Sequence, residues 1–171
     1  MCTTCEELNI PERLWKLDKP IIHDFKDDVI YRRFKVVGPK ENWKTLNLTA
    51  SVFQLNTDSY NKASLCESAD DVLFNSVKAD CGKHYTNWGI LSISSNDLTD
   101  INSKKIKLNN EERVFTLKFQ HVPEDCMYPH SEILIMEDDT KLLPKAPKSI
   151  GVIIRDFFVE KCNIIKYPIA G

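Results

Sequence analysis

The side chains most able to do chemistry gather in the segment FQHVPEDCMYPHSEIL, which holds His121, Cys126 and His130. We expect His121 to end one strand and His130 to precede the next. Pro123 and Pro129 stiffen the connection between them, so the two imidazoles are expected to lie close together. Imidazole and thiolate are ligands that suit Zn²⁺, which usually binds four of them. The segment therefore predicts either a zinc site or a pair of catalytic histidines.

Other segments supply partners for such a site. A fourth zinc ligand could come from Cys81 or His84, in the segment DCGKH. Glu124 could act as an acid or base beside a bound water, and either His121 or His130 could be a general base. The alternative interpretation is structural, with histidines that cap strand ends, because the spacing matches no well-specified zinc finger. We therefore expect no resident cofactor, with zinc as the alternative.

The remaining cysteines carry weaker signals. Cys2 and Cys5 form a C-x2-C half-motif, which is typical of metal or redox sites but incomplete alone. At the start of the chain, two exposed thiols on a frayed terminus are the simpler interpretation. Cys66 and Cys162 lie beside apolar helical stripes and are expected in the core. Without an export signal, free thiols are favoured over disulfides.

A basic strand is the third candidate site. Arg32, Arg33 and Lys35 follow an aromatic residue, and Lys44 comes shortly after them next to a tryptophan. Such an array can bind phosphates and stack on bases. The alternative is a solvated edge strand whose charges discourage aggregation.

The apolar pattern predicts the elements that hold these residues. Alternation and β-branched content indicate strands at 29–37, 45–55, 88–94, 113–122 and 131–136, with an edge strand in the tail. A helix is predicted over 68–79, with Ser68 as its cap, and another over about 149–161, with Ser149 as its cap. The second helix has an apolar stripe of Ile150, Ile153, Ile154, Phe157 and Phe158. The polar segment 95–112 is predicted to be a loop.

Strands outnumber helices and occur in runs, which favours an α+β fold over a doubly wound one. We expect a mainly antiparallel sheet with the C-terminal helix and one internal helix packed on it. The 171 residues suit a single domain, 1–171, in which residues 1–12 are loosely ordered.

Composition excludes several classes of protein. The net charge of −2 removes the strongest electrostatic argument for nucleic-acid binding. No apolar run approaches the roughly 20 residues that span a bilayer, and no signal peptide is recognisable. These features predict a cytoplasmic protein without membrane contact. Neither a G-x-S-x-G elbow nor a nucleotide-binding glycine loop occurs.

The order of several motifs resembles a group of small uncharacterised bacterial proteins. ERLWKLDKP resembles the segment that opens those proteins, and YRRF, NWGILSIS and HVPEDCMYPHSEIL stand where they have an aromatic segment, a strand and a late P…HA.I motif. The likeness covers about two thirds of the chain. The chain departs from the pattern with Trp-Lys-Leu in the first motif and with a longer polar insert at 95–112. The resemblance implies His130 as the functional residue and a bacterial multi-protein system, with antiphage defence as one setting, but no established activity.

Three hypotheses follow. The first is a non-catalytic interaction or accessory subunit with a protein partner, which the near-neutral charge and the expected exposure of Trp15, Trp43 and Trp88 favour. The second is a small hydrolase or nuclease that uses His121 and His130, with or without zinc. The third is a nucleic-acid-binding accessory protein that uses the arginine strand. We favour the first. The sequence leaves the partner and the oligomeric state open.

Overall fold

The computed structural model describes residues 6, 10–15, 21–24, 28–34, 60–74, 85–103, 105–122, 127–143 and 147–169. The strands in this part of the chain are β1 (Ile21–Asp24), β2 (Val29–Phe34), β3 (Tyr60–Lys62), β4 (Gly89–Ser94), β5 (Lys105–Leu108), β6 (Glu111–His121), β7 (His130–Glu137), β8 (Lys141–Leu143) and β9 (Asn163–Lys166). The α-helices are α2 (Ser95–Ser103) and α3 (Lys148–Lys161). Short 3₁₀ turns are η1 (Glu12–Leu14), η4 (Ala63–Leu65) and η5 (Ala69–Leu73).

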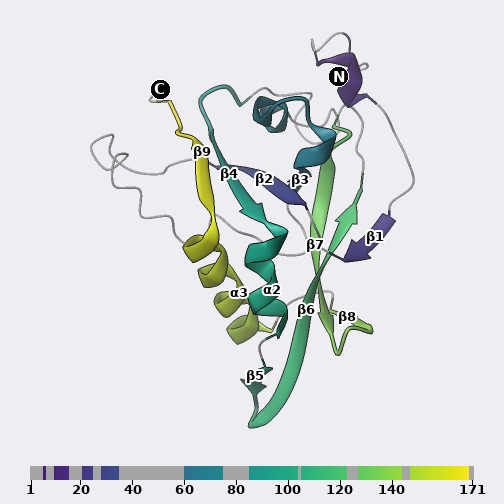
Figure 1. Ribbon diagram of the computed structural model, residues 1–171, viewed down its shortest axis with the longest axis vertical. Coiled ribbons are helices and arrows are strands. Elements are labelled where there is room, and N and C mark those ends of the chain that lie inside the picture. Colours follow the sequence, from purple (N-terminus) through teal and green to yellow (C-terminus); the bar gives the residue numbers. More distant parts are fainter. Residues whose placement is uncertain are drawn as a thin grey trace.

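These strands form one sheet, and every pairing between the described strands is antiparallel. Its order is β1-β6-β7-β3-β2-β4-β9, with β5 beside β6 and β8 beside β7 (Figure 1). This arrangement confirms the predicted α+β fold with a mainly antiparallel sheet and a C-terminal helix. None of the described helices is long and apolar enough to cross a bilayer.

The hairpin of β6 and β7 is the longest ladder of the sheet, running from Phe115↔Glu137 to His121↔Ser131. Alternate residues of β6 are buried, as the period-2 pattern predicts. At the β5–β6 turn, Asn109 and Asn110 have positive φ angles of 54° and 68°. A two-residue loop with that geometry matches the right-handed twist of the strands, and asparagine tolerates it better than most residues.

Strand β3 joins the two halves of the sheet and is very short. It pairs with β2 through Ile30↔Lys62 and Tyr31↔Asn61, and with β7 through Tyr60↔Ser131 and Asn61↔His130. One half comprises β2, β4 and β9, and the other comprises the long hairpin with its flanking strands. Among the described strands, the backbone ladders on the two sides of β3 are therefore the shortest in the sheet.

One face of the sheet packs against α2 and α3. Buried side chains of α3 and β6, together with Ile101 of α2, belong to a single apolar cluster. The predicted stripe of α3 is confirmed at Ile150, Ile154, Phe157 and Phe158. Ile153 is 39% exposed, however, so that part of the prediction is wrong.

The helix α2 lies where the sequence predicts a loop. Ser94 and Asp97 form a reciprocal cap, in which the Asp97 N–H donates to Ser94 Oγ at 3.3 Å and Asp97 Oδ2 accepts from the Ser94 N–H at 3.3 Å. Two such bonds satisfy donors that a helix start leaves unpaired. Ile101 is buried against the core. The loop prediction for 95–112 is therefore wrong, because this segment forms α2, β5 and the start of β6. The cap and the burial of Ile101 stabilise α2 in spite of its polar composition.

The predicted helix over 68–79 is also not observed. The turn η5 ends at Leu73, Phe74 has extended geometry, and residues 75–79 lie outside the described part. Ser68 makes no capping hydrogen bond. Val72 and Leu73 are instead buried in a second cluster on the other face of the sheet, with Ile90 and Met127. Burial of two consecutive side chains suits a tight turn better than an amphipathic helix. The strand predicted over 45–55 lies outside the described residues.

The start of α3 differs in detail from the prediction. Pro147 occupies the N-cap position, and its carbonyl accepts a hydrogen bond from the Gly151 N–H at 2.9 Å. Ser149 therefore lies inside the helix and is not its cap. The edge strand predicted in the tail is confirmed as β9, which pairs with β4.

Gly89 allows β2 and β9 to approach β4 closely. A Cβ atom placed there would lie 2.5 Å from Phe34 Cε1 and 2.7 Å from the carbonyl oxygen of Lys166. We expect Gly89→Ala to lower the free energy of unfolding by about 1–3 kcal/mol, because overpacking forces neighbours out of position. Urea denaturation measures this. The pair Phe34→Leu with Gly89→Ala should be less destabilised than the sum of the single variants, and strict additivity would contradict the contact.

Candidate functional site

The structure places the two candidate histidines where the sequence predicts them. His121 ends β6 and His130 begins β7, and both are buried, with 7% and 5% of their surface exposed. His121 lies directly opposite Ser131 in the ladder. Since neighbouring residues of a strand point to opposite faces, the side chain of His130 leaves the sheet on the other face. The expected convergence of the imidazoles on one face is therefore not observed.

Each imidazole is instead bound to the backbone of the connection between the strands. His121 Nε2 donates to the carbonyl oxygen of Tyr128 at 2.7 Å, and His130 Nδ1 donates to that of Val122 at 2.7 Å. Because a carbonyl only accepts, these two ring nitrogens carry the hydrogen. Each histidine thus binds a residue on the opposite side of the bend. We call this pair of bonds the histidine clamp.

Further contacts hold the same bend against the β6–β7 ladder and against η1. The ring of His121 meets that of Tyr128 edge to face, with centroids 5.0 Å apart. The Val122 N–H donates to His130 O at 3.0 Å, and the Tyr128 N–H donates to Leu14 O at 3.0 Å. The bend is thereby tied to the ladder on one side and to the N-terminal turn η1 on the other. This arrangement fits the structural interpretation of the histidines.

The zinc hypothesis stays a prediction. No group of three metal-binding side chains occurs among the described residues. The other candidates of the sequence, Cys126, Cys81, His84 and Glu124, lie outside the described part, as do Cys2 and Cys5. Glu137 ends β7 and its carboxylate pairs with Arg113, and Asp139, in the turn that follows, pairs with Lys118 at 2.8 Å.

The two candidate arginines point to opposite faces of β2, as their adjacency requires. Arg32 lies over the ring of Tyr60 at 4.9 Å, and Arg33 lies over the ring of Tyr85 at 4.6 Å. Arg33 Nη1 also donates to the carbonyl oxygens of Val72 and Phe74. Both guanidinium groups thus contact neighbouring parts of the fold. Lys35 and Lys44 lie outside the described residues.

Cys66 and Cys162 are free and partly buried, and each contacts the apolar clusters. Burial raises the pKa of Cys66 to about 12 and that of Cys162 to about 11. Both thiols are therefore protonated at neutral pH and poor nucleophiles, since the thiolate is the reactive form. The prediction that they fill the core is consistent with this environment.

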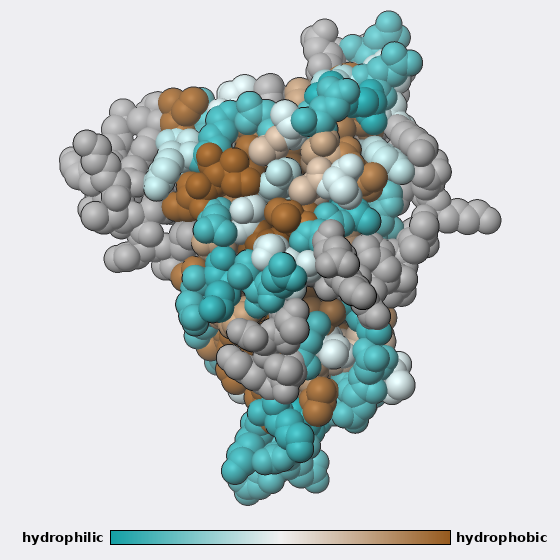
Figure 2. Space-filling view, viewed as in Figure 1, coloured by the Kyte–Doolittle hydropathy of each residue, from teal (hydrophilic) through white to brown (hydrophobic). Residues whose placement is uncertain are grey.

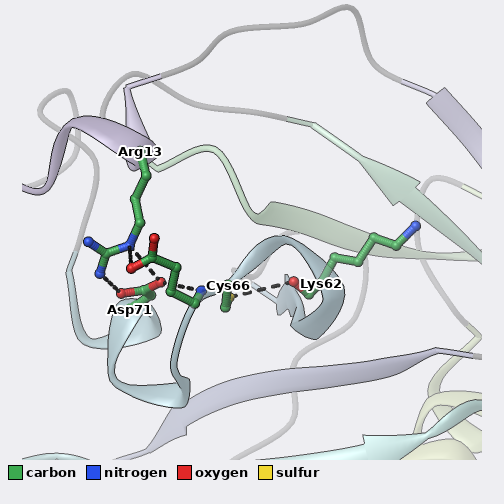
Figure 3. A network of polar contacts seen from close by, with 5 residues as sticks. Arg13, Lys62, Cys66 and Asp71 are labelled. Atoms are coloured by element: carbon green, nitrogen blue, oxygen red, sulfur yellow. Dashed lines mark hydrogen bonds and ion pairs between the residues drawn. The ribbon is translucent and has the colours of Figure 1, made fainter.

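An ion-pair network links the N-terminal turn to η5, and the sequence gives no signal for it (Figure 3). Arg13 Nη2 and Nε donate to the carboxylate of Asp71 at 2.5 and 3.3 Å. Asp71 is 1% exposed and also accepts from the Glu67 N–H at 2.9 Å. These contacts raise the pKa of Arg13, chiefly through the hydrogen bond with Asp71. A carboxylate is rarely buried unless paired, so composition alone would place Asp71 at the surface.

A hollow of about 410 Å³ lies beside this network, bounded by η5 and β9. Its walls carry charged pairs, Arg13 with Asp71 and Lys166 with Asp70, the latter at 2.8 Å. Since these charges are mutually paired, the hollow has no strong preference for one sign of ligand.

Three large apolar side chains are exposed in β9 and in the segment directly after it. Ile165, Tyr167 and Ile169 are 46%, 57% and 57% exposed. Figure 2 shows hydrophobic surface over the region of β9 and β4. Of the tryptophans expected to be exposed, Trp15 and Trp88 are instead partly buried against apolar clusters, and Trp43 lies outside the described residues.

The histidine clamp generates a stability prediction. His121→Leu and His130→Leu should each lower the free energy of unfolding by about 1–3 kcal/mol, because each leaves a buried carbonyl without its donor. Gln120→Leu, at a half-buried position of the same strand, is the control and should change it by less than about 0.5 kcal/mol. Urea denaturation of the three variants makes the comparison. If all three variants lowered the free energy of unfolding by the same small amount, the histidine clamp would not be a stabilising feature.

Alanine variants of two neighbouring aspartates test how much the buried carboxylate contributes to stability. Asp71→Ala should cost about 1–3 kcal/mol, because the Glu67 N–H loses its acceptor and the Arg13 guanidinium keeps only its ion pair with the exposed Glu67 carboxylate. Asp70→Ala removes an ion pair in which the carboxylate is 63% exposed, so it should cost well under about 1 kcal/mol. Thermal unfolding ranks the two. A larger loss for Asp70→Ala would show that the buried network is not the stabilising one.

Comparison with known proteins adds no relative to this description: no family model, curated protein or solved structure matches the chain.

Proposed function

We propose that this protein is a non-catalytic interaction subunit that binds a partner protein through the apolar side chains of its C-terminal segment, residues 165–169. The observation that carries the proposal is the exposure of Ile165, Tyr167 and Ile169, three large apolar side chains at alternate positions. Interfaces are enriched in aromatic anchors of this kind, and a few such residues usually supply most of the binding energy.

The segment is held in place by contacts on its other side. The Ile169 N–H donates to Asn87 O at 3.0 Å, Pro168 is buried, and Lys166 pairs with Asp70 at 2.8 Å. A segment that is already ordered loses less conformational entropy on binding than a free tail. These contacts therefore support a preformed apolar stripe as a docking surface.

Docking is expected through side chains and not by addition of a strand to the sheet edge. The register of β4 with β9 shifts between Ile90 and Leu91, which places Ile165 in an irregularity of the edge. Pro168, two residues after the end of β9, lacks an N–H donor. Bulges, prolines and lysines are features that blunt an edge against pairing.

The setting that we propose is a bacterial multi-protein system, such as one in antiphage defence. It rests on the motif resemblance, and the net charge of −2 is compatible with it. A hydrolase or nuclease would use His121 and His130, but both donate to backbone carbonyls from opposite faces of the sheet. A nucleic-acid-binding function would use Arg32 and Arg33, which also diverge. Neither alternative gains support among the described residues.

A matched pair of double variants tests the proposal. Tyr167→Ser with Ile169→Ser removes two anchors of the stripe, whereas Leu142→Ser with Val152→Ser removes two exposed apolar side chains elsewhere. Each protein is purified from its native host, and co-purifying proteins are quantified by mass spectrometry. We expect the first variant to lose its partner roughly tenfold or more, since two anchors are worth at least about 1 kcal/mol each.

The control variant should retain the partner, and both should unfold at nearly the wild-type temperature. Light scattering of the purified protein identifies the case in which the partner is a second copy of this chain. Retention of the same partner by the Tyr167→Ser, Ile169→Ser protein would refute the proposed surface.

A further inference from the structure

Asn61 is a fully buried amide at the centre of the sheet. It is 0% exposed and occupies the middle position of β3. Neither its Oδ1 nor its Nδ2 has a hydrogen-bond partner in the part of the chain that the structure describes. Buried polar side chains almost always have partners, so an amide with none calls for a specific explanation.

The surroundings of Asn61 are polar across the neighbouring strands. It lies directly opposite Tyr31 on β2 and directly opposite His130 on β7. Residues that face each other in this way share a face of the sheet, with Cβ atoms about 4.5–5.5 Å apart. Tyr31 and His130 therefore share the face of the sheet on which the amide lies, and neither forms a direct hydrogen bond with it. Polar groups without a direct protein partner are commonly bridged by water.

We propose that Asn61 binds an internal water molecule on this face of the sheet, between β3 and its neighbouring strands. The water accepts from Nδ2 or donates to Oδ1, and takes its remaining bonds from polar groups of the flanking strands. Internal waters typically make about three hydrogen bonds to buried polar groups that would otherwise be unsatisfied.

The position gives this water a structural role. β3 has two register pairs with β2 and two with β7, and among the described strands it is the one that connects the two halves of the sheet. A hydrogen-bonded water at Asn61 adds a side-chain link where the backbone ladder is shortest. This inference is independent of the proposed interaction surface, because Asn61 lies in β3 whereas that surface is formed by residues 165–169.

The test uses the full-length protein and two measurements. In the wild type, nuclear Overhauser spectroscopy in water should show a cross peak between the Asn61 side-chain NH₂ and a long-lived water. Asn61→Leu, which is close in size but apolar, should lose that water and unfold about 2–4 °C lower, the shift that a loss of about 1 kcal/mol produces in a chain of this length.

A higher unfolding temperature for Asn61→Leu would overturn the proposal, because it would mean that the amide is an uncompensated polar group. Absence of the water cross peak in the wild type would overturn it as well. The wild-type measurement is decisive even if the variant does not fold.

Discussion

The backbone ladder between β6 and β7 is the constraint on which the other features depend. It extends from Phe115 and Glu137 to His121 and Ser131, and its register decides which side chains enter the core. One register fixes Phe115, Leu117 and Phe119 against α3 and sends the intervening residues to the other face. A slip by one residue would reverse every one of these placements. The same register separates His121 from His130, so the geometry of the candidate site is a consequence of core packing.

The histidine clamp shows how a segment rich in reactive residue types can serve architecture. A bend that contains prolines leaves carbonyl groups without ladder partners, and two imidazole N–H groups satisfy two of them at 2.7 Å. A carbonyl that is shielded from water also needs a donor, although less strictly than a buried N–H needs an acceptor. Histidine can donate from either ring nitrogen, and the two residues of the clamp use different ones, Nε2 in His121 and Nδ1 in His130.

Much of the sheet is predictable because its signal is local. The strands near 29–34, 89–94, 111–121 and 130–137 all follow from alternation or β-branched runs, and α3 follows from its apolar spacing. The helix α2 was not predicted because its stability depends on the Ser94–Asp97 cap and on Ile101, which outweigh a polar composition. At 69–73 the pattern predicts a helix, but the structure has a short 3₁₀ turn. Asp71 in this turn is buried against Arg13, and a contact between such distant parts of the chain leaves no local signal in the sequence. The opposite-face placement of His121 and His130 depends on the register in which β6 pairs with β7, and the sequence pattern of the two strands does not specify that register.

The brevity of β3 bears on the route by which the chain folds. The hairpin of β6 and β7, with β5 and β8 at its flanks, uses residues that are close in sequence, from Lys105 to Leu143. Such contacts have low contact order and cost little loop-closure entropy, so they can form early. The other half draws β2, β4 and β9 from across the chain and meets the hairpin only through β3 in the order of the sheet. The hairpin is therefore suited to act as a nucleus, and the long-range strands to condense onto it in a later, slower step.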